Sequence, residues 1–381
     1  MGRRGQLPTG VLVLLFVALL DVVITRTPLF YGELSIEHPR DFGLVQYVQT
    51  MRVVRALFFE PPAESVQRVA LLGDSRITLA ARAPTLEREL RHAAPATATR
   101  VANLGIFGAR IGDLEALSRH LDHLQPSVVV LALGGSELLP DSQARFVSYP
   151  ARVFDLGWRD GPVPPDGMEG RLDRWLRTAW TTYRYRELID MALADRVAPD
   201  PSPIRPPPDH RLSPREFFAY RSALGSTHSD RSAWRAYQTW RRSGGFDAFV
   251  RYLQTTGALA PRSIDDQWRA ELRPGSIGLR TLDRLLGRLG EGRWRSMVVL
   301  MPVNPLLEQD VAGQYHVPDL SERTSIAIAS LAERHGVPVV DARRWVTAEA
   351  FVDFVHLFTD CRQFQRPLAQ VIARALADPH D

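Results

Sequence analysis

A serine stands where the sequence predicts that a buried strand gives way to a helix. Residues 69–72 are all apolar and Gly73 permits a tight turn, so Ser75 falls just beyond the carboxyl end of this strand. Open α/β sheets place their ligands at that end, and the first N–H groups of a following helix point to the same spot. A serine held there can attack an ester carbonyl, provided that a base takes its proton.

The base that this chemistry needs is offered near the other end of the chain, by Asp353 and His356. Residues three apart can share one face of a helical turn. The carboxylate could then hold the imidazole in one tautomer, leaving its other nitrogen to take the serine proton. An extended run at 337–340 precedes the pair, and a helical pattern at about 364–377 follows it. The order and position of these pieces predict a Ser75–His356–Asp353 triad, and a surface turn is the alternative.

These motifs resemble the SGNH, or GDSL, hydrolase superfamily. Gly73-Asp74-Ser75 matches the first block of that family, residues 101–108 match the second, and Asp353 with His356 matches the last. The resemblance implies that Ser75 is the nucleophile of an ester-directed enzyme. It also implies that the backbone N–H groups of Ser75 and Gly105 form the oxyanion hole.

The third block departs from the family pattern. Gly134-Gly135-Ser136-Glu137 stands where the family usually has Gly-x-Asn-Asp, so Ser136 replaces the asparagine that supplies a side-chain donor. Losing one oxyanion donor typically costs about 10²–10³ in turnover. Either Ser136 fills the role or the backbone donors suffice, and a degenerate relative is the alternative. The other polar residues expected to line the pocket are Asp74, Asn103, Glu137 and Asn304.

The elements needed to position these residues have the order of an α/β fold. Apolar strand patterns at about 68–72, 100–104, 127–133, 297–301 and 337–341 alternate with helical patterns at about 76–92, 111–124, 277–289 and 320–335. This alternation predicts a flavodoxin-like three-layer sandwich with a central parallel sheet of about five strands. The SGNH-like domain spans 67–377. Residues 141–274 carry few strand signals and predict a helical insertion, placed to form a lid or an acceptor-binding wall.

The first 25 residues predict a membrane anchor. Arg3 and Arg4 precede an apolar run at 11–24 that only Asp21 interrupts. A run of this kind, extended by residues 7–10, approaches the length of a transmembrane helix, and the arginines favour a cytoplasmic N-terminus. The domain would then lie on the extracytoplasmic, periplasmic side of the cytoplasmic membrane, behind a juxtamembrane connector at 26–66. A cleaved signal peptide and a buried cytosolic helix are the alternatives.

Composition excludes several other function classes. The formal net charge of +4 is spread along the chain, which does not favour nucleic-acid binding. The single cysteine, Cys361, excludes an intramolecular disulfide. No glycine-rich phosphate loop or dinucleotide fingerprint is present. His120 and His123 lack a third ligand at sensible spacing, so no metal and no cofactor is expected.

The resemblance and the anchor together imply extracytoplasmic serine-dependent acyl transfer, as an O-acetyltransferase or an esterase, on an envelope or exopolysaccharide glycan. By the same resemblance, a membrane-bound O-acyltransferase would be the partner that supplies acyl groups. A plain carbohydrate or lipid ester hydrolase is one alternative. A catalytically degenerate protein that binds glycan or assists assembly is the other.

Overall fold

The computed structural model describes a parallel five-stranded sheet. The described residues are 9–26, 52–53, 56–57, 66–138, 172, 175–176, 180, 272–305, 317–351, 355–357 and 361–377. The strands are β1 (Gln67–Leu72), β2 (Thr99–Asn103), β3 (Val128–Leu133), β4 (Arg295–Leu300) and β5 (Val339–Asp341). They pair in the order β2-β1-β3-β4-β5, and every pairing is parallel. The α/β class and the parallel sheet of five strands are therefore confirmed.

The strand order brings the carboxyl ends of β1 and β3 together. From β1 the chain first adds β2 on one side and then returns to add β3 on the other. The crevice between β1 and β3 is the topological switch point, where sheets of this kind hold their ligands. Leu71 pairs with Asn103 on one side and with Val130 on the other, so β1 and β2 end within one residue of each other, whereas β3 continues to Leu133.

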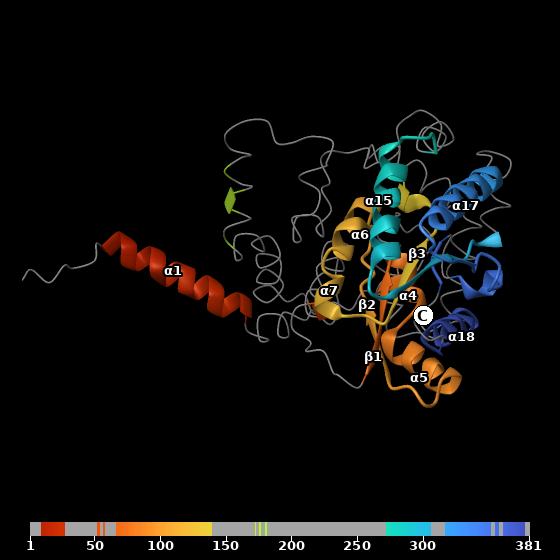
Figure 1. The fold of residues 1–381 in the computed structure, drawn as a ribbon, viewed down its shortest axis with the longest axis horizontal. Coiled ribbons are helices and arrows are strands. Elements are labelled where there is room, and N and C mark those ends of the chain that lie inside the picture. Colours follow the sequence, from red (N-terminus) through yellow and green to blue (C-terminus); the bar gives the residue numbers. More distant parts are fainter. Residues whose placement is uncertain are drawn as a thin grey trace, which may run out of the picture.

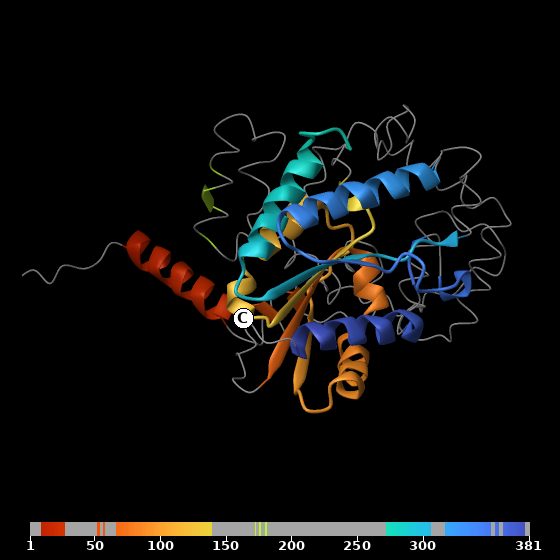
Figure 2. The ribbon, with the colours of Figure 1, turned by 45° about the vertical axis from the view of Figure 1, so that its right-hand side comes forward.

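Two hydrophobic cores cover the two faces of the sheet, because alternate side chains of each strand point to opposite faces. Ala70 and Leu72 of β1 pack into one core with helices α6 (Ile111–Ser118), α15 (Ile277–Glu291) and α17 (Val317–Arg334). Val69 and Leu71 pack into the other with α4 (Ser75–Ala80), α5 (Ala83–Ala93) and α18 (Arg362–Ala377). Figure 1 labels these helices, and the rotated view in Figure 2 shows α15 and α17 above the strands and α18 below them.

Two of the predicted helices are each divided in the structure. The pattern at 76–92 forms α4 and α5, which are separated at Ala81 and Arg82, because Pro84 lies in the first turn of α5 and starts a new helix. The pattern at 111–124 forms α6 and the short α7 (Leu121–Leu124). The break at Ala81 and Arg82 limits α4 to six residues, so the segment that carries Ser75 is short.

The N-terminal helix α1 (Thr9–Arg26) has 18 residues. Its exposed large apolar side chains are Val11, Leu12, Val13, Leu15, Phe16 and Leu19. Among the described residues, no helix combines the length and the apolarity needed to span a membrane. Most of the connector at 26–66 and nearly all of the predicted insertion at 141–274 lie outside the described residues.

Candidate active site

The turn after β1 presents Ser75 at the first position of α4. Asp74 caps this helix: its side chain accepts a hydrogen bond of 2.9 Å from the Arg76 backbone N–H. Gly73 is required by close packing, since a Cβ atom there would lie 2.7 Å from the Ala132 carbonyl oxygen of β3. The strand, the glycine turn and the cap together fix the direction in which the serine leaves the backbone.

Ser75 and His356 meet, although 281 residues separate them in the chain. The Ser75 Oγ lies 2.5 Å from the His356 Nε2, within hydrogen-bond distance. Both residues are buried, with exposed fractions of 9% and 6%. The ring of Phe107 stacks beside the imidazole, with the ring centroids 6.5 Å apart. The predicted pairing of these two residues is thus present in the structure, in a setting that excludes most solvent.

His356 enters the site from a reversed loop. Phe351 and Leu357 form an antiparallel bridge, and both side chains belong to the core on the α18 face. His356 itself has no helical conformation, and residues 352–354, which the predicted helical turn includes in part, lie outside the described residues. Burial of Phe351 and Leu357 in the core holds the imidazole near the sheet edge. Asp353, the predicted third member of the triad, lies outside the described residues.

A buried cluster of three charged residues lies at the turn between β1 and α4. Arg76 donates from its Nε and Nη2 atoms to the Asp74 carboxylate at 3.0–3.2 Å. Its Nη2 atom also lies 2.5 Å from the Glu137 Oε1. Glu137 belongs to the 3-10 turn η1 (Ser136–Leu138), which follows β3. One guanidinium therefore ties the helix that carries Ser75 to the end of the neighbouring strand.

Burial and ion pairing act in opposite directions on this cluster. Burial alone would raise the pKa of Asp74, but the charge and hydrogen bonds of Arg76 outweigh it, so the pKa of this carboxyl lies below its ordinary value. At Glu137 burial dominates and raises the pKa above its ordinary value, with the nearby Asp74 charge acting in the same direction. Both carboxylates raise the pKa of the guanidinium against the effect of its burial, so Arg76 stays charged.

The loop after β2 is tied to α4 by the side chain of Asn103. The Asn103 Oδ1 accepts a hydrogen bond of 2.9 Å from the Gly105 N–H, and the Asn103 Nδ2 donates to the carbonyls of Ile77 and Ala81. The Gly105 N–H is thus already donated, which is not the geometry expected of an oxyanion donor. Asn103 ties this loop to α4 and is not a free pocket residue, because its amide is committed to three backbone groups.

Further along the same loop, Gly108 has an unusual backbone conformation. It is exposed, has a φ of 70°, and directly follows Phe107, whose ring lies beside His356. A positive φ favours glycine and turns the backbone N–H away from the regular direction. In the sequence it is the second glycine of the 101–108 block, three residues after Gly105.

The remaining residues predicted to line the pocket have different surroundings in the structure. Ser136 begins η1, and its side chain lies outside the described part of the structure. Asn304 follows β4 at the same edge of the sheet and is almost fully buried, so it is part of the packed wall. Asp74 and Glu137 are committed to Arg76, as described above.

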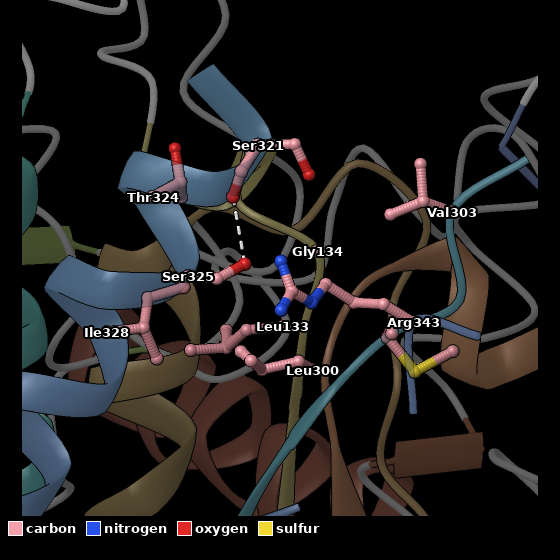
Figure 3. A pocket seen from close by; sticks show the side chains of 10 residues that line it. Leu133, Gly134, Leu300, Val303, Ser321, Thr324, Ser325, Ile328 and Arg343 are labelled. Atoms are coloured by element: carbon pink, nitrogen blue, oxygen red, sulfur yellow. Dashed lines mark hydrogen bonds between the residues drawn. The ribbon is translucent and has the colours of Figure 1, made fainter. Parts of the chain in front are cut away.

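A small pocket lies at the ends of β3 and β4, next to this cluster (Figure 3). The residues that line it are Leu133, Gly134, Leu300, Met301, Val303, Ser321, Thr324, Ser325, Ile328 and Arg343. Arg343 extends into it but is paired with Asp341 and Glu322, and the Ser325 hydroxyl donates to the Ser321 carbonyl. Neither Ser75 nor His356 lines this pocket, so it is not the place where the serine would meet a substrate.

Gly134 is where the charged cluster and the end of β3 touch. A Cβ atom added there would lie 1.5 Å from the Arg76 Nη1, and the buried guanidinium is held by two carboxylates and cannot easily withdraw. We expect Gly134→Ala to lower the free energy of unfolding by about 1–3 kcal/mol, the usual cost of overpacking. Urea unfolding measures this.

Gly112→Ala is the matched control for this substitution. Gly112 lies in α6, and a Cβ atom there would have no neighbour within 4 Å. Alanine is a better helix former than glycine, so a gain of at most about 1 kcal/mol is expected. Equal effects of the two substitutions would contradict the packing argument.

Possible metal ligands do not converge in the described parts of the chain. His120 and His123 stack on each other, with ring centroids 6.1 Å apart. No group of three or more His, Cys, Asp or Glu residues within the described ranges is arranged to hold a metal ion. The two histidines therefore form an aromatic pair at α7.

Comparison with models of known protein families finds no match for this chain, and comparison with curated proteins also finds none. The geometry of Ser75 and His356 and the motifs in the sequence are therefore what bear on function.

Proposed function

We propose that this protein is a serine-dependent acyl-transfer enzyme of the SGNH type, with Ser75 as nucleophile and His356 as base. The observation that carries this proposal is the 2.5 Å contact between the Ser75 Oγ and the His356 Nε2. A nucleophile and a base within hydrogen-bond reach, both in a site largely closed to water, are what acyl transfer requires. By the family resemblance, Asp353 orients the imidazole from three residues away.

The reaction follows from the positions of these atoms. With the proton of the neutral imidazole on Nδ1, the Ser75 hydroxyl donates its hydrogen bond to Nε2. As Oγ attacks the ester carbonyl, Nε2 takes the hydroxyl proton and then gives it to the departing alcohol. The acyl group leaves Ser75 when water or a sugar hydroxyl attacks the acyl-serine, with His356 again taking the proton. The two outcomes are hydrolysis and transfer.

The oxyanion that forms during attack needs backbone donors. The Ser75 N–H stands at the first position of α4, where no intrahelical acceptor exists. Because the Gly105 N–H is donated to Asn103, we assign the second donor to Gly108. Its positive φ and its place beside Phe107 support this assignment. Ser136 is the third candidate donor in this proposal.

The substrate and location are proposed from the sequence and from α1. As described, α1 is not long and apolar enough to span a membrane, but its exposed apolar side chains can contact lipid. With the arginines that precede it in the sequence, this supports a domain held at the periplasmic face of the cytoplasmic membrane. There the acceptor would be an envelope or exopolysaccharide glycan, and a membrane-bound O-acyltransferase would be the acyl donor. The alternatives are a plain carbohydrate or lipid ester hydrolase and a catalytically degenerate glycan-binding protein.

Mass spectrometry of the protein after exposure to an activated acetyl ester tests this function. We expect the intact protein to gain one acetyl group, which peptide mapping places on Ser75, because the base activates only this hydroxyl. Ser75→Ala should gain none. Absence of labelling in the wild type would favour the binding protein. Faster loss of the label to oligosaccharide than to water would favour the transferase over the hydrolase.

A further inference from the structure

The buried charges of Asp74, Arg76 and Glu137 have no part in the acyl-transfer steps described above. The Arg76 and Asp74 side chains are 8% and 12% exposed, and that of Glu137 is fully buried. Placing three charges in a protein interior is costly, and apolar packing would often be as stable. Their position directly behind the nucleophile suggests a role for them in the chemistry.

The charge of the cluster does not cancel. Arg76 contributes one positive charge, whereas Asp74 and Glu137 together contribute two negative charges when both are ionised. Since Glu137 shares the guanidinium, Arg76 cannot fully neutralise Asp74. Whenever Glu137 is ionised, the arrangement leaves an excess of one negative charge in the interior, where it is weakly screened.

This excess charge lies close to the His356 imidazole. Asp74 is bonded to Ser75, consecutive Cα atoms are about 3.8 Å apart, and the Ser75 hydroxyl touches the His356 Nε2. Arg76 holds both oxygens of the Asp74 carboxylate, so the carboxylate cannot turn away. All of these residues are buried.

The ionisation of Asp74 agrees with this geometry. Arg76 overcomes the effect of burial and keeps the pKa of the carboxyl low, so Asp74 remains charged throughout the range in which a histidine titrates. The attraction between Asp74 and His356 is one of the further causes that lower this pKa. Attraction of this kind is mutual and must favour the charged imidazole to the same extent.

We propose that Asp74 is a positioning residue for the acyl-transfer reaction, whose clamped carboxylate stabilises the imidazolium form of His356 as it takes the Ser75 proton. Glu137 supports this effect by taking up part of the Arg76 charge. This inference rests on the proposed function only for its catalytic consequence. The predicted effect of Asp74 on the pKa of the His356 imidazole does not depend on that function.

The charged groups of the cluster, of which Asp74 interacts electrostatically with His356, come from two elements. Asp74 and Arg76 belong to the start of α4, and Glu137 belongs to η1. The positive charge of Arg76 opposes the effect of the two carboxylates on the His356 pKa, and Arg76 is paired with both of them. Asp353 is common to all variants below, so it does not contribute to the differences between them.

The pKa of the His356 imidazole in the full-length chain is the direct test, measured by NMR titration of histidine-labelled protein and assigned by comparison with His356→Gln. We expect Asp74→Asn to lower this pKa by about one unit, the usual effect of removing a nearby opposite charge. Asparagine is an equally good helix cap and retains the acceptor for the Arg76 N–H. Glu137→Gln should lower the His356 pKa by a smaller amount. This second variant provides the test if Asp74→Asn does not fold.

Glu115→Gln is the matched control. Glu115 is a buried carboxylate paired with an arginine, but it lies on α6, which packs on the opposite face of the sheet from α4. No change in the His356 pKa is expected. A His356 pKa that stays unchanged in Asp74→Asn and Glu137→Gln would overturn the inference, as would an equal change in Glu115→Gln.

A second measurement separates this inference from the proposed function. The rate of Ser75 acylation by the activated ester should fall at low pH as His356 becomes protonated, and in Asp74→Asn this fall should move to lower pH by the same shift. If the wild type is not acylated at Ser75, the proposed function fails while the NMR result still decides the inference. If acylation occurs and Asp74→Asn lowers it equally at every pH, the cluster only packs and the inference fails.

Discussion

Replacing Ser75 with alanine is expected to lower the rate of acyl transfer by about 10⁴–10⁶-fold, and replacing His356 with alanine by a similar factor. The double replacement should cost no more than either single one. Nucleophile and base act as one unit across the 2.5 Å hydrogen bond, so removal of either leaves the other without a function. Steady-state hydrolysis of an acetyl-ester chromogenic substrate measures all three variants.

The control for this experiment is Ser118→Ala. Ser118 is also buried, and its hydroxyl also donates a hydrogen bond, but to the Glu115 carbonyl within α6. Its removal should leave the rate within a factor of a few of the wild type. If the Ser75 and His356 variants keep wild-type rates, or if their separate losses multiply in the double variant, the two residues do not act as a catalytic pair.

Replacing Arg76 with methionine is expected to lower the free energy of unfolding by about 3–5 kcal/mol, the usual cost of leaving buried charges without their partner. Methionine fills much of the space of the arginine stem but cannot donate to Asp74 or to Glu137. Two buried carboxylates would then face each other without a cation between them. Urea unfolding followed by circular dichroism measures the loss.

Arg119→Met provides the comparison. Arg119 also pairs with a buried carboxylate, that of Glu115, but the arginine side chain is 37% exposed, so water can replace it. A loss below about 1 kcal/mol is expected there. Adding Glu137→Gln to Arg76→Met should restore part of the stability, since it removes one of the stranded charges. A small loss in Arg76→Met would mean that Arg76 contributes little to holding the α4 turn against β3.

Local sequence patterns determined the sheet and the place of Ser75. The apolar runs that became β1, β3 and β4 are nearly continuous because these strands are covered on both faces. Gly73 and Ser75 could be placed at the end of β1 because a strand, a glycine turn and a helix cap are properties of adjacent residues. The division of the 76–92 pattern into α4 and α5 was missed, although Pro84 signals it.

Long-range contacts decided the rest of the site. Asp353-x-x-His356 predicted the base by its order in the chain, but the contact of His356 with Ser75 depends on the core packing of Phe351 and Leu357, which form an antiparallel bridge. Gly105 was predicted to donate to the oxyanion, whereas the side chain of Asn103 competes for its N–H. Such competition depends on where a side chain points in space, which spacing along the chain does not specify.

Patterns of neighbouring residues were enough to predict which segments form strands, their parallel arrangement and the residue types at the sheet edge. The folded chain was needed to find that Glu137 shares Arg76 with Asp74, and that position 134 must lack a side chain to make room for the guanidinium. The physical reason is that strand and turn preferences act between neighbours in the chain. The pairing of buried charges depends on groups that come together only when β1 and β3 lie side by side.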